Sequence, residues 1–532
     1  MRNRTDPTPV AVAEPVPPVS YTRRFASNLT YGLAGAAARF SVGMFLVGYV
    51  IRRLGPDHWG LIVVGMTTAS ILGLIQLGAS AGVAKKLNTA MTRQETHLFS
   101  QYFTASILLS VSLAGVMMAG LGMLLTVGWS WLKIGPSLAV EGRWVLGAIG
   151  LSVVATALSL PFLACMQAVH RIDVHAKVHT AGLILRACAV VVAFEWSKPR
   201  AATYAIIIMA VAILMLAAAA LWVRHRVSAA RMVRGGIDRG VLCDLTAFNL
   251  LTLINSVTYV VFMQTPTLVL QRCSGLATAG LYGIGLQLNL LVRGFLVPAT
   301  NALSPVAISL ESREKGEQMT TLFRLSSKAF AGIALMLWVG FIFLGEPFLT
   351  LWLGREEPEL VAALPWLIGA SAVGVAAMPS AVFLVAQERL RIPGVVGLVL
   401  AAVMIVAMVN VAGRDADHLL VPMSQLLMLF FTAYQCVRVW VAGRGVRLTP
   451  RELLVDLVLR PAIPAAGGAA VLLVNDMIGE VKGFVHLGVA AMGALLVFGL
   501  FAYVGLFSRD ERALVRERIR SLQHNRRRPQ AR

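Results

Sequence analysis

The stretch RRLGPDHWGLIVVG, residues 52–65, indicates how this chain folds. It joins two apolar runs, at 27–51 and 61–84, each long enough to cross a bilayer as a helix. A similar stretch, QRCSGLATAGLYGIG at 271–285, joins two later runs. In each copy an arginine ends one run, a turn with glycine follows, and an aromatic residue with a glycine begins the next, as Trp59-Gly60 and Tyr282-Gly283. An even number of runs separates the copies, which predicts two parallel repeats.

Composition supports a membrane protein. Of the 532 residues, 57% are hydrophobic and only 14% are charged, whereas an ordinary globular domain has roughly 25% charged residues. The apolar runs are continuous rather than alternating, which favours helices over a barrel. We therefore predict an all-α polytopic membrane protein with two parallel six-helix lobes around a central cavity and two extra carboxyl-terminal helices. The predicted spans are 27–51, 61–84, 103–128, 144–167, 178–196, 202–223, 246–270, 276–300, 327–346, 361–386, 393–412, 419–441, 461–475 and 484–507.

The basic residues predict the orientation. The formal net charge is +21, and most Lys and Arg fall in cytoplasmic loops if both termini are cytoplasmic. This topology explains the charge without a nucleic-acid partner. The predicted divisions are a disordered cytoplasmic tail at 1–24, an amino-terminal lobe at 25–240, a carboxyl-terminal lobe at 241–445, two extra spans at 446–508 and a basic cytoplasmic tail at 509–532, which is also suited to lie on anionic lipid.

Several motifs resemble one family of transporters. LGPDHWGL (54–61) and LIQLGASAGVAKKL (74–87), together with AGLYGIGLQL, VPATNALSPVAISL and FLTLWLG further on, are similar to the polysaccharide flippases of the multidrug/oligosaccharidyl-lipid/polysaccharide superfamily. The resemblance covers roughly residues 25–510. It implies a V-shaped cavity between two lobes, and alternating access that carries a polyprenyl-diphosphate-linked glycan outward across the bacterial inner membrane, as in O-antigen or exopolysaccharide assembly. A polysaccharide polymerase and other assembly proteins are the partners that this role implies, beside membrane lipid.

Three arginines, Arg39, Arg186 and Arg293, are expected at bilayer depth within predicted spans, where a charge is costly and normally faces protein or water. A guanidinium matches phosphate oxygens in pairs, so these side chains are candidate ligands of the diphosphate. Polar neighbours at helical spacing complete the predicted substrate path: Asn28, Tyr31, Asn255, Tyr259, Tyr282 and Asn289.

Simpler roles remain open for these residues. Arg186 could snorkel or pair with Glu195 near the end of its span. Polar groups of the seventh span could form interhelical hydrogen bonds. Arg52 and Arg53 are expected at the outer mouth, in a surface, substrate-binding or gating role. Pro266 and Pro298 are candidate hinges or tolerated kinks.

The sequence favours no enzyme, metal site or cofactor. HRIDVHAKVH (170–179) carries His175 and His179 at i, i+4, but it lies in a predicted cytoplasmic loop beside cationic residues. There is no phosphate-binding loop, and the five cysteines are scattered. A lipid II flippase and a drug or metabolite exporter are the alternatives within the superfamily. A membrane glycosyltransferase, polymerase or ligase would need a large loop, and the loops here are short. A scaffold protein would not need arginines at bilayer depth.

Overall fold

The computed structural model describes residues 21–74, 83, 86–91, 93–169, 171–227, 229–233, 250–413, 418–479 and 483–506. Helices are the regular secondary structure of this part of the chain. The amino-terminal half contains α1 (Tyr21–Leu54), α2 (Pro56–Leu72), α4 (Thr96–Thr126), η1 (Gly128–Leu132), η2 (Pro136–Leu138), α5 (Ala139–Ala168), α6 (Ile172–Trp196) and α7 (Ala201–Arg226). The carboxyl-terminal half contains α9 (Leu250–Cys273), α10 (Leu276–Ser312), α11 (Gly316–Leu353), α12 (Pro358–Ala376), α13 (Met378–Ala386), α14 (Arg391–Ala412) and α15 (Leu420–Gly445). The chain continues with α16 (Pro450–Leu454), η3 (Val455–Leu459), α17 (Arg460–Ile478), α18 (Gly483–Phe501) and η4 (Ala502–Leu506).

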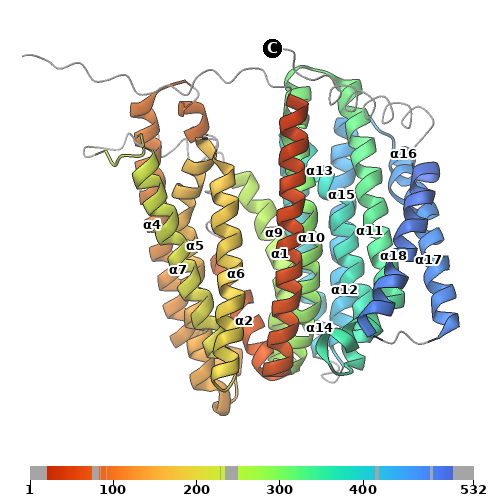
Figure 1. The fold of residues 1–532 in the computed structure, drawn as a ribbon, viewed down its shortest axis with the longest axis horizontal. Helices are drawn as coiled ribbons and strands as arrows, with labels where there is room; N and C mark the ends of the chain where they lie inside the picture. Colours follow the sequence, from red (N-terminus) through yellow and green to blue (C-terminus); the bar gives the residue numbers. More distant parts are fainter. Residues whose placement is uncertain are drawn as a thin grey trace, which may run out of the picture.

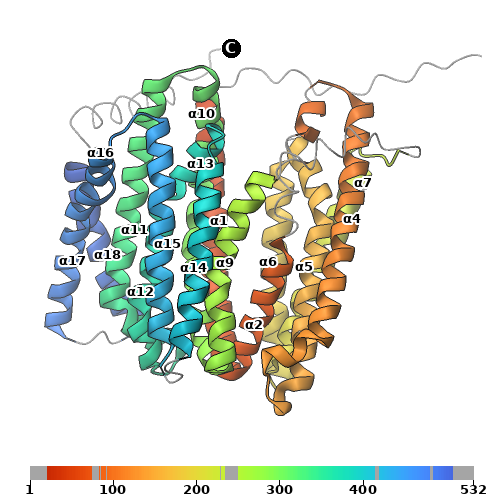
Figure 2. The same cartoon turned by 180° about the vertical axis from the view of Figure 1, so that it is seen from behind.

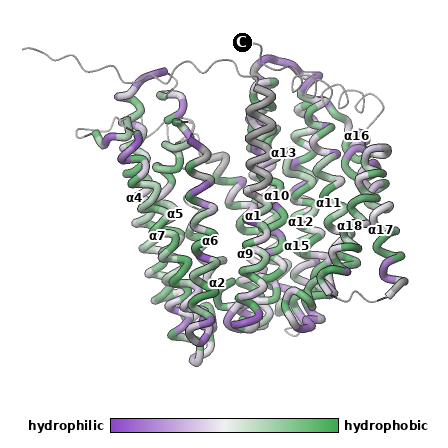
Figure 3. Tube along the Cα trace, in the orientation of Figure 1, coloured by the Kyte–Doolittle hydropathy of each residue, from purple (hydrophilic) through white to green (hydrophobic). Residues whose placement is uncertain are grey.

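Each predicted span overlaps a helix, which confirms the all-α membrane fold. Within the described residues, eleven helical segments are long and apolar enough to cross a membrane, and α10 would make a twelfth across its bend, so the expected count of fourteen is not confirmed. Most residues along the lengths of the helices are hydrophobic, and hydrophilic residues gather towards the two ends of the bundle (Figure 3). Of the predicted tails, α1 takes in the last residues of 1–24, while 1–20 and 509–532 lie outside the described residues.

The two halves stand side by side. Helices α4–α7 form one group and α9–α15 the other, with α17 and α18 on the outer flank of the second group (Figures 1 and 2). The groups converge where α1 ends and α2 begins, which we call the Gly55 end. There α2 packs against both α9 and α10 across the boundary between the halves, while α1 packs on α10 and α6. The largest hydrophobic core of the described residues lies across this convergence and includes the fully buried Trp59 and Tyr282.

Two matching corners build the Gly55 end. Gly55 precedes α2 with φ 79° and Gly275 precedes α10 with φ 95°, a left-handed backbone that favours glycine. Shortly after each corner, α2 and α10 cross at Gly60 and Gly280. A Cβ atom on Gly60 would lie 1.9 Å from the carbonyl oxygen of Leu276. The crossing therefore depends on the missing side chain.

The corners also correct the alignment of the two repeats. The sequence suggested that Trp59-Gly60 corresponds to Tyr282-Gly283, but the structure places Gly60 opposite Gly280. Aligning Gly55 with Gly275 also pairs Arg52 with Arg272 and Gly65 with Gly285. Gly65 packs on Ile149 of α5, and Gly285 packs on Leu367 of α12. These contacts have the same place in each repeat, because α5 and α12 are the fourth and tenth predicted spans.

Candidate functional site

Two arginines lie together in the interior of the carboxyl-terminal half. The guanidinium of Arg293 on α10 lies over the ring of Tyr259 on α9, 4.2 Å from its centroid. Arg438 on α15 lies 5.6 Å from the ring centroid of Tyr434 and donates a hydrogen bond of 2.8 Å to Gln435. The two arginines are close enough to repel each other. Among the described residues no carboxylate forms an ion pair with either of them.

Polar groups of α9 and α15 lie beside these cations. Asn255 of α9 donates to the carbonyl oxygen of Leu390 at 3.3 Å, and its own oxygen lies 3.5 Å from the hydroxyl of Tyr434. Tyr259 and Tyr434 both contact the ring of Phe431. We call Asn255, Tyr259, Arg293, Tyr434 and Arg438 the arginine cluster. Because it gathers two cations without a carboxylate, it can accept an anion with several oxygens.

Sequence reasoning found part of this cluster. Arg293, Tyr259 and Asn255 were predicted, and the structure brings them together. Arg438 was missed, although it lies four residues after Tyr434 on the same face of a predicted span. That spacing was the available signal, since residues at i and i+4 are neighbours on a helix.

Tyr282 and Asn289 lie elsewhere. Both side chains are buried between α10 and α9, where the Tyr282 hydroxyl donates to the carbonyl oxygen of Met263 at 3.1 Å. The Asn289 amide lies 3.6 Å from the sulfur of the same methionine. These contacts join two neighbouring helices, and the structure does not bring either residue into the arginine cluster.

The arginines of the amino-terminal half are separate from the cluster. Arg39 is half-buried on α1, and its guanidinium runs back along the helix beside Gly35. Arg186 of α6 is half-buried, and its Nε atom is fully buried without a hydrogen-bond partner among the described residues. Asn28 and Tyr31 belong to α1, and their side chains lie outside the described part of the structure.

The predicted mouth residues divide into two kinds. Arg52 donates to the carbonyl oxygen of Trp352 at 2.9 Å, on α11 of the other half. Arg53 pairs with Glu195 of α6, within its own half. Pro266 is buried inside α9, whereas Pro298 follows a bend of 44° between Gly294 and Leu296 of α10.

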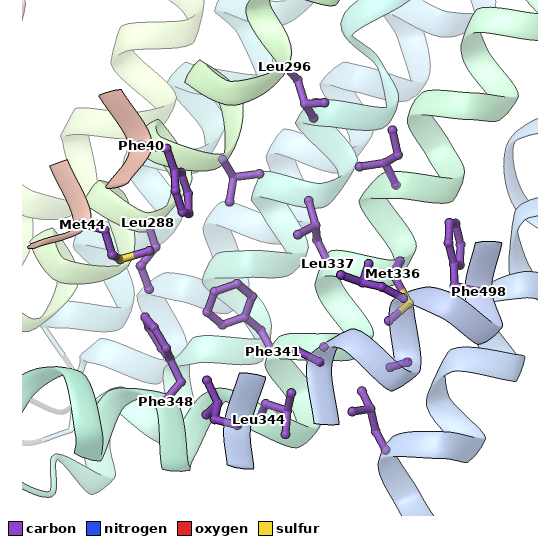
Figure 4. Close-up of a pocket in the computed structure, with 18 residues that line it drawn as sticks. Phe40, Met44, Leu288, Leu296, Met336, Leu337, Phe341, Leu344, Phe348 and Phe498 are labelled. Carbon is purple, nitrogen blue, oxygen red and sulfur yellow. The ribbon is translucent and has the colours of Figure 1, made fainter. Parts of the chain in front are cut away.

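A hydrophobic cavity of about 470 Å³ lies among α1, α10, α11, α17 and α18. Phe40 and Met44 of α1 lie beside Leu288 of α10 on one side of it, and Met336 of α11 and Phe498 of α18 lie on the other side (Figure 4). The remaining lining residues come from α10, α11, α17 and α18 and are also apolar. Val292 lines this cavity and is adjacent in sequence to Arg293. An apolar chain and an anion could therefore bind on neighbouring surfaces of α10.

The structure also contains a buried ionic cluster that the sequence did not suggest. Asp456, on the π-helical turn η3, lies 2.7 Å from Arg324, 3.4 Å from Lys328 and 3.2 Å from Arg460. The Lys328 side chain is 0% exposed and that of Asp456 is 3% exposed. This cluster attaches α17 to α11. Among the described residues no three His, Cys, Asp or Glu side chains gather closely enough to hold a metal ion.

Comparisons with known proteins identify the family of this chain. The sequence model of the family described as "Polysaccharide biosynthesis protein" matches residues 50–361. The membrane protein EpsK of Bacillus subtilis (strain 168), itself described as uncharacterized, is 21% identical over 402 residues, which are 74% of this chain and 77% of EpsK.

Solved structures of transporters share the fold. The lipid II flippase MurJ in an inward closed conformation superposes with a TM-score of 0.65 at 10% identity, over 91% of this chain and 98% of MurJ. An inward-facing multidrug resistance transporter of the MATE family, from the MOP superfamily, gives a TM-score of 0.56 at 15% identity, over 77% of this chain and 98% of that protein. The family match and the shared fold confirm the resemblance seen in the sequence. This chain is a polytopic membrane protein that belongs to the polysaccharide biosynthesis protein family and shares its fold with MurJ and the MATE transporter.

Proposed function

We propose that the protein moves a polyprenyl-diphosphate-linked oligosaccharide across the bacterial inner membrane for the assembly of a surface polysaccharide. The observation that supports this most directly is the pairing of two chemically different surfaces on α10. Arg293 belongs to a cluster with Arg438, and the adjacent Val292 lines a hydrophobic cavity. A lipid-linked glycan has both features in one molecule, a diphosphate and a long hydrocarbon chain.

The arginine cluster suits the diphosphate. Guanidinium groups bind phosphate oxygens in pairs, and these interactions are strong where water is scarce. Tyr259, Tyr434 and Asn255 add the aromatic and hydrogen-bonding groups that sugars need. A cationic drug would be repelled by Arg293 and Arg438, which disfavours the exporter alternative. Arg39 and Arg186 would offer positive charge to the same substrate from the other half.

The hydrophobic cavity suits the polyprenyl chain. It is bounded by α1 and α10, the two helices through which a tail in the lipid could reach the interior. The positive charges of the loops favour cytoplasmic termini, and the Gly55 end would then lie outside. In this orientation the convergence of the halves closes the outer side. The product would then be passed outside to a polymerase and other assembly proteins.

The test uses cells that lack the gene for this chain. They are complemented at matched expression with the wild type, with Arg293→Gln plus Arg438→Gln, or with Arg444→Gln as the control. Arg444 is on the same helix but stacks on Trp440 at 4.5 Å, outside the cluster. We expect the deletion to lose surface polysaccharide and to accumulate its lipid-linked precursor, and the double variant to fail where the control rescues.

The other outcomes separate the alternatives. Full rescue by the double variant would refute the role of the arginine cluster. A deletion that impairs cell-wall synthesis and leaves surface polysaccharide intact would indicate a lipid II flippase. A change in drug tolerance alone would indicate an exporter.

A further inference from the structure

The Gly55 end contains two matching contacts between the halves, each made by one copy of the sequence repeat. Arg52 lies in the last turn of α1, and its Nε atom donates to the carbonyl oxygen of Trp352 near the end of α11 at 2.9 Å. Its Nη2 atom donates to the adjacent carbonyl oxygen of Leu351. We call this contact between α1 and α11 the Arg52 latch.

The second contact repeats the first with the halves exchanged. Arg272 ends α9, and its Nη1 atom donates to the carbonyl oxygen of Trp131 in η1 at 2.7 Å. The adjacent Gln271 donates to the carbonyl oxygen of Leu132 at 3.0 Å. The Arg272 guanidinium also lies 5.5 Å from the centroid of the Trp131 ring. We call this contact the Arg272 latch.

The acceptors correspond as well as the donors do. Trp131-Leu132 ends η1, just after the third predicted span of one repeat, and Trp352-Leu353 ends α11, which contains the third predicted span of the other. The next residue has a left-handed backbone in both places, with φ 47° at Lys133 and 73° at Gly354. Helix ends of this kind leave carbonyl oxygens without intrahelical partners and carry partial negative charge. Each arginine therefore satisfies a helix end that belongs to the opposite half.

We infer that these two latches and the Gly60–Gly280 crossing form one two-fold gate that holds the Gly55 end closed. Both latches cross the boundary between the halves, so neither survives if the halves separate there. Arg272, Gln271 and Gly280 thereby gain a role that the sequence had suggested only for the Arg52 side. The inference rests on the proposed function, because a transporter must open this end to release its substrate outside.

Arg53 provides a matched control in the same turn of α1. Its guanidinium pairs with Glu195, which also accepts a hydrogen bond of 2.8 Å from Tyr49. Glu195 lies at the end of α6, in the same half as Arg53. Loss of Arg53 removes a cation and an ion pair from the Gly55 end but no contact between the halves.

The test measures access to the interface between α2 and α9 from outside the cell. Thr67 of α2 is buried there and donates to Gln264 of α9 at 2.8 Å. A single cysteine replaces Thr67 in a chain whose five native cysteines are changed to serine, after complementation shows that this chain is active. Intact cells are treated with a charged maleimide that does not cross membranes, and the labelling rate is measured.

A closed gate makes labelling slow in the wild type. Hydrogen bonds of this kind shift a two-state equilibrium by roughly three- to tenfold. We therefore expect Arg52→Gln and Arg272→Gln each to raise the rate by about threefold, and both together by about tenfold. Arg53→Gln should leave it unchanged. Arg272→Lys keeps one donor and should give an intermediate rate.

A second measurement separates opening from unfolding. Cysteines at 67 and 264 are cross-linked by mild oxidation in the membrane, and the yield should fall in the latch variants while the protein still elutes as a single species. Equal labelling of the Arg52, Arg272 and Arg53 variants would overturn the inference. If the wild type fails to restore surface polysaccharide, the proposed function is wrong, and the labelling rates still report on the latches.

Discussion

The crossing of α2 and α10 gives the sharpest prediction, through the variant Gly60→Ala. The new methyl group would lie 1.9 Å from the carbonyl oxygen of Leu276 and 2.7 Å from its carbonyl carbon. Carbon atoms rarely approach within about 3 Å of such an atom, so the two backbones must separate by about 1 Å. The obstacle is backbone rather than a flexible side chain, which leaves separation of the helices as the main way to relieve the clash.

The cost follows from that distance. Overpacking of a well-packed contact costs about 1–3 kcal/mol. Alanine in place of glycine stabilises a helix by up to about 1 kcal/mol, which offsets part of this cost. A net cost of about 1.4 kcal/mol to the closed state alone would raise the open population about tenfold. Gly280→Ala should have a smaller effect, because its nearest atom, the carbonyl oxygen of Pro56, lies at 2.7 Å. Gly115→Ala in α4 is the control, since a Cβ there meets nothing within 4 Å.

The assay is the external labelling of a cysteine at Thr67, together with thermal unfolding in detergent. We expect labelling to increase in the order Gly115→Ala, Gly280→Ala, Gly60→Ala. Because the clash destabilises only the closed state, the unfolding temperature of the Gly60 variant should fall little. If Gly60→Ala labels and unfolds like Gly115→Ala, the close crossing is not part of the closed state, and the reasoning fails.

Two further predictions concern the carboxyl-terminal helices. Asp456→Asn removes the carboxylate beside the fully buried Lys328 and should cost about 3 kcal/mol of stability, seen as a lower unfolding temperature in detergent. The control Glu452→Gln, at an exposed ion pair with Arg324, should change the unfolding temperature little. A result in which both variants unfold alike would show that the buried pair is not stabilising. Gly340→Leu should fill part of the hydrophobic cavity, since no atom lies within 4 Å of a Cβ there, and should reduce surface polysaccharide with normal folding. Gly499→Leu, equally open but outside the cavity lining, is its control, and equal transport by the two variants would contradict a role of the cavity.

The sequence by itself determined the all-α membrane architecture and the family. A helix in lipid satisfies its backbone hydrogen bonds within its own length, so a span is a local property that a run of apolar residues reveals. The same logic identified Arg293, because a charge at bilayer depth is conspicuous against apolar neighbours. The repeat was visible in the sequence too, but its register was wrong until Gly60 was seen opposite Gly280.

Tertiary structure alone decided which side chains meet. Arg52 and Arg53 are adjacent in the sequence, yet one binds α11 and the other α6, because successive residues on a helix point about 100° apart. The packing of α15 brings Arg438 near Arg293. The packing of η3 on α11 brings Asp456 to Lys328. These partners are far apart along the chain, so their meeting depends on how whole helices pack, which no local pattern records.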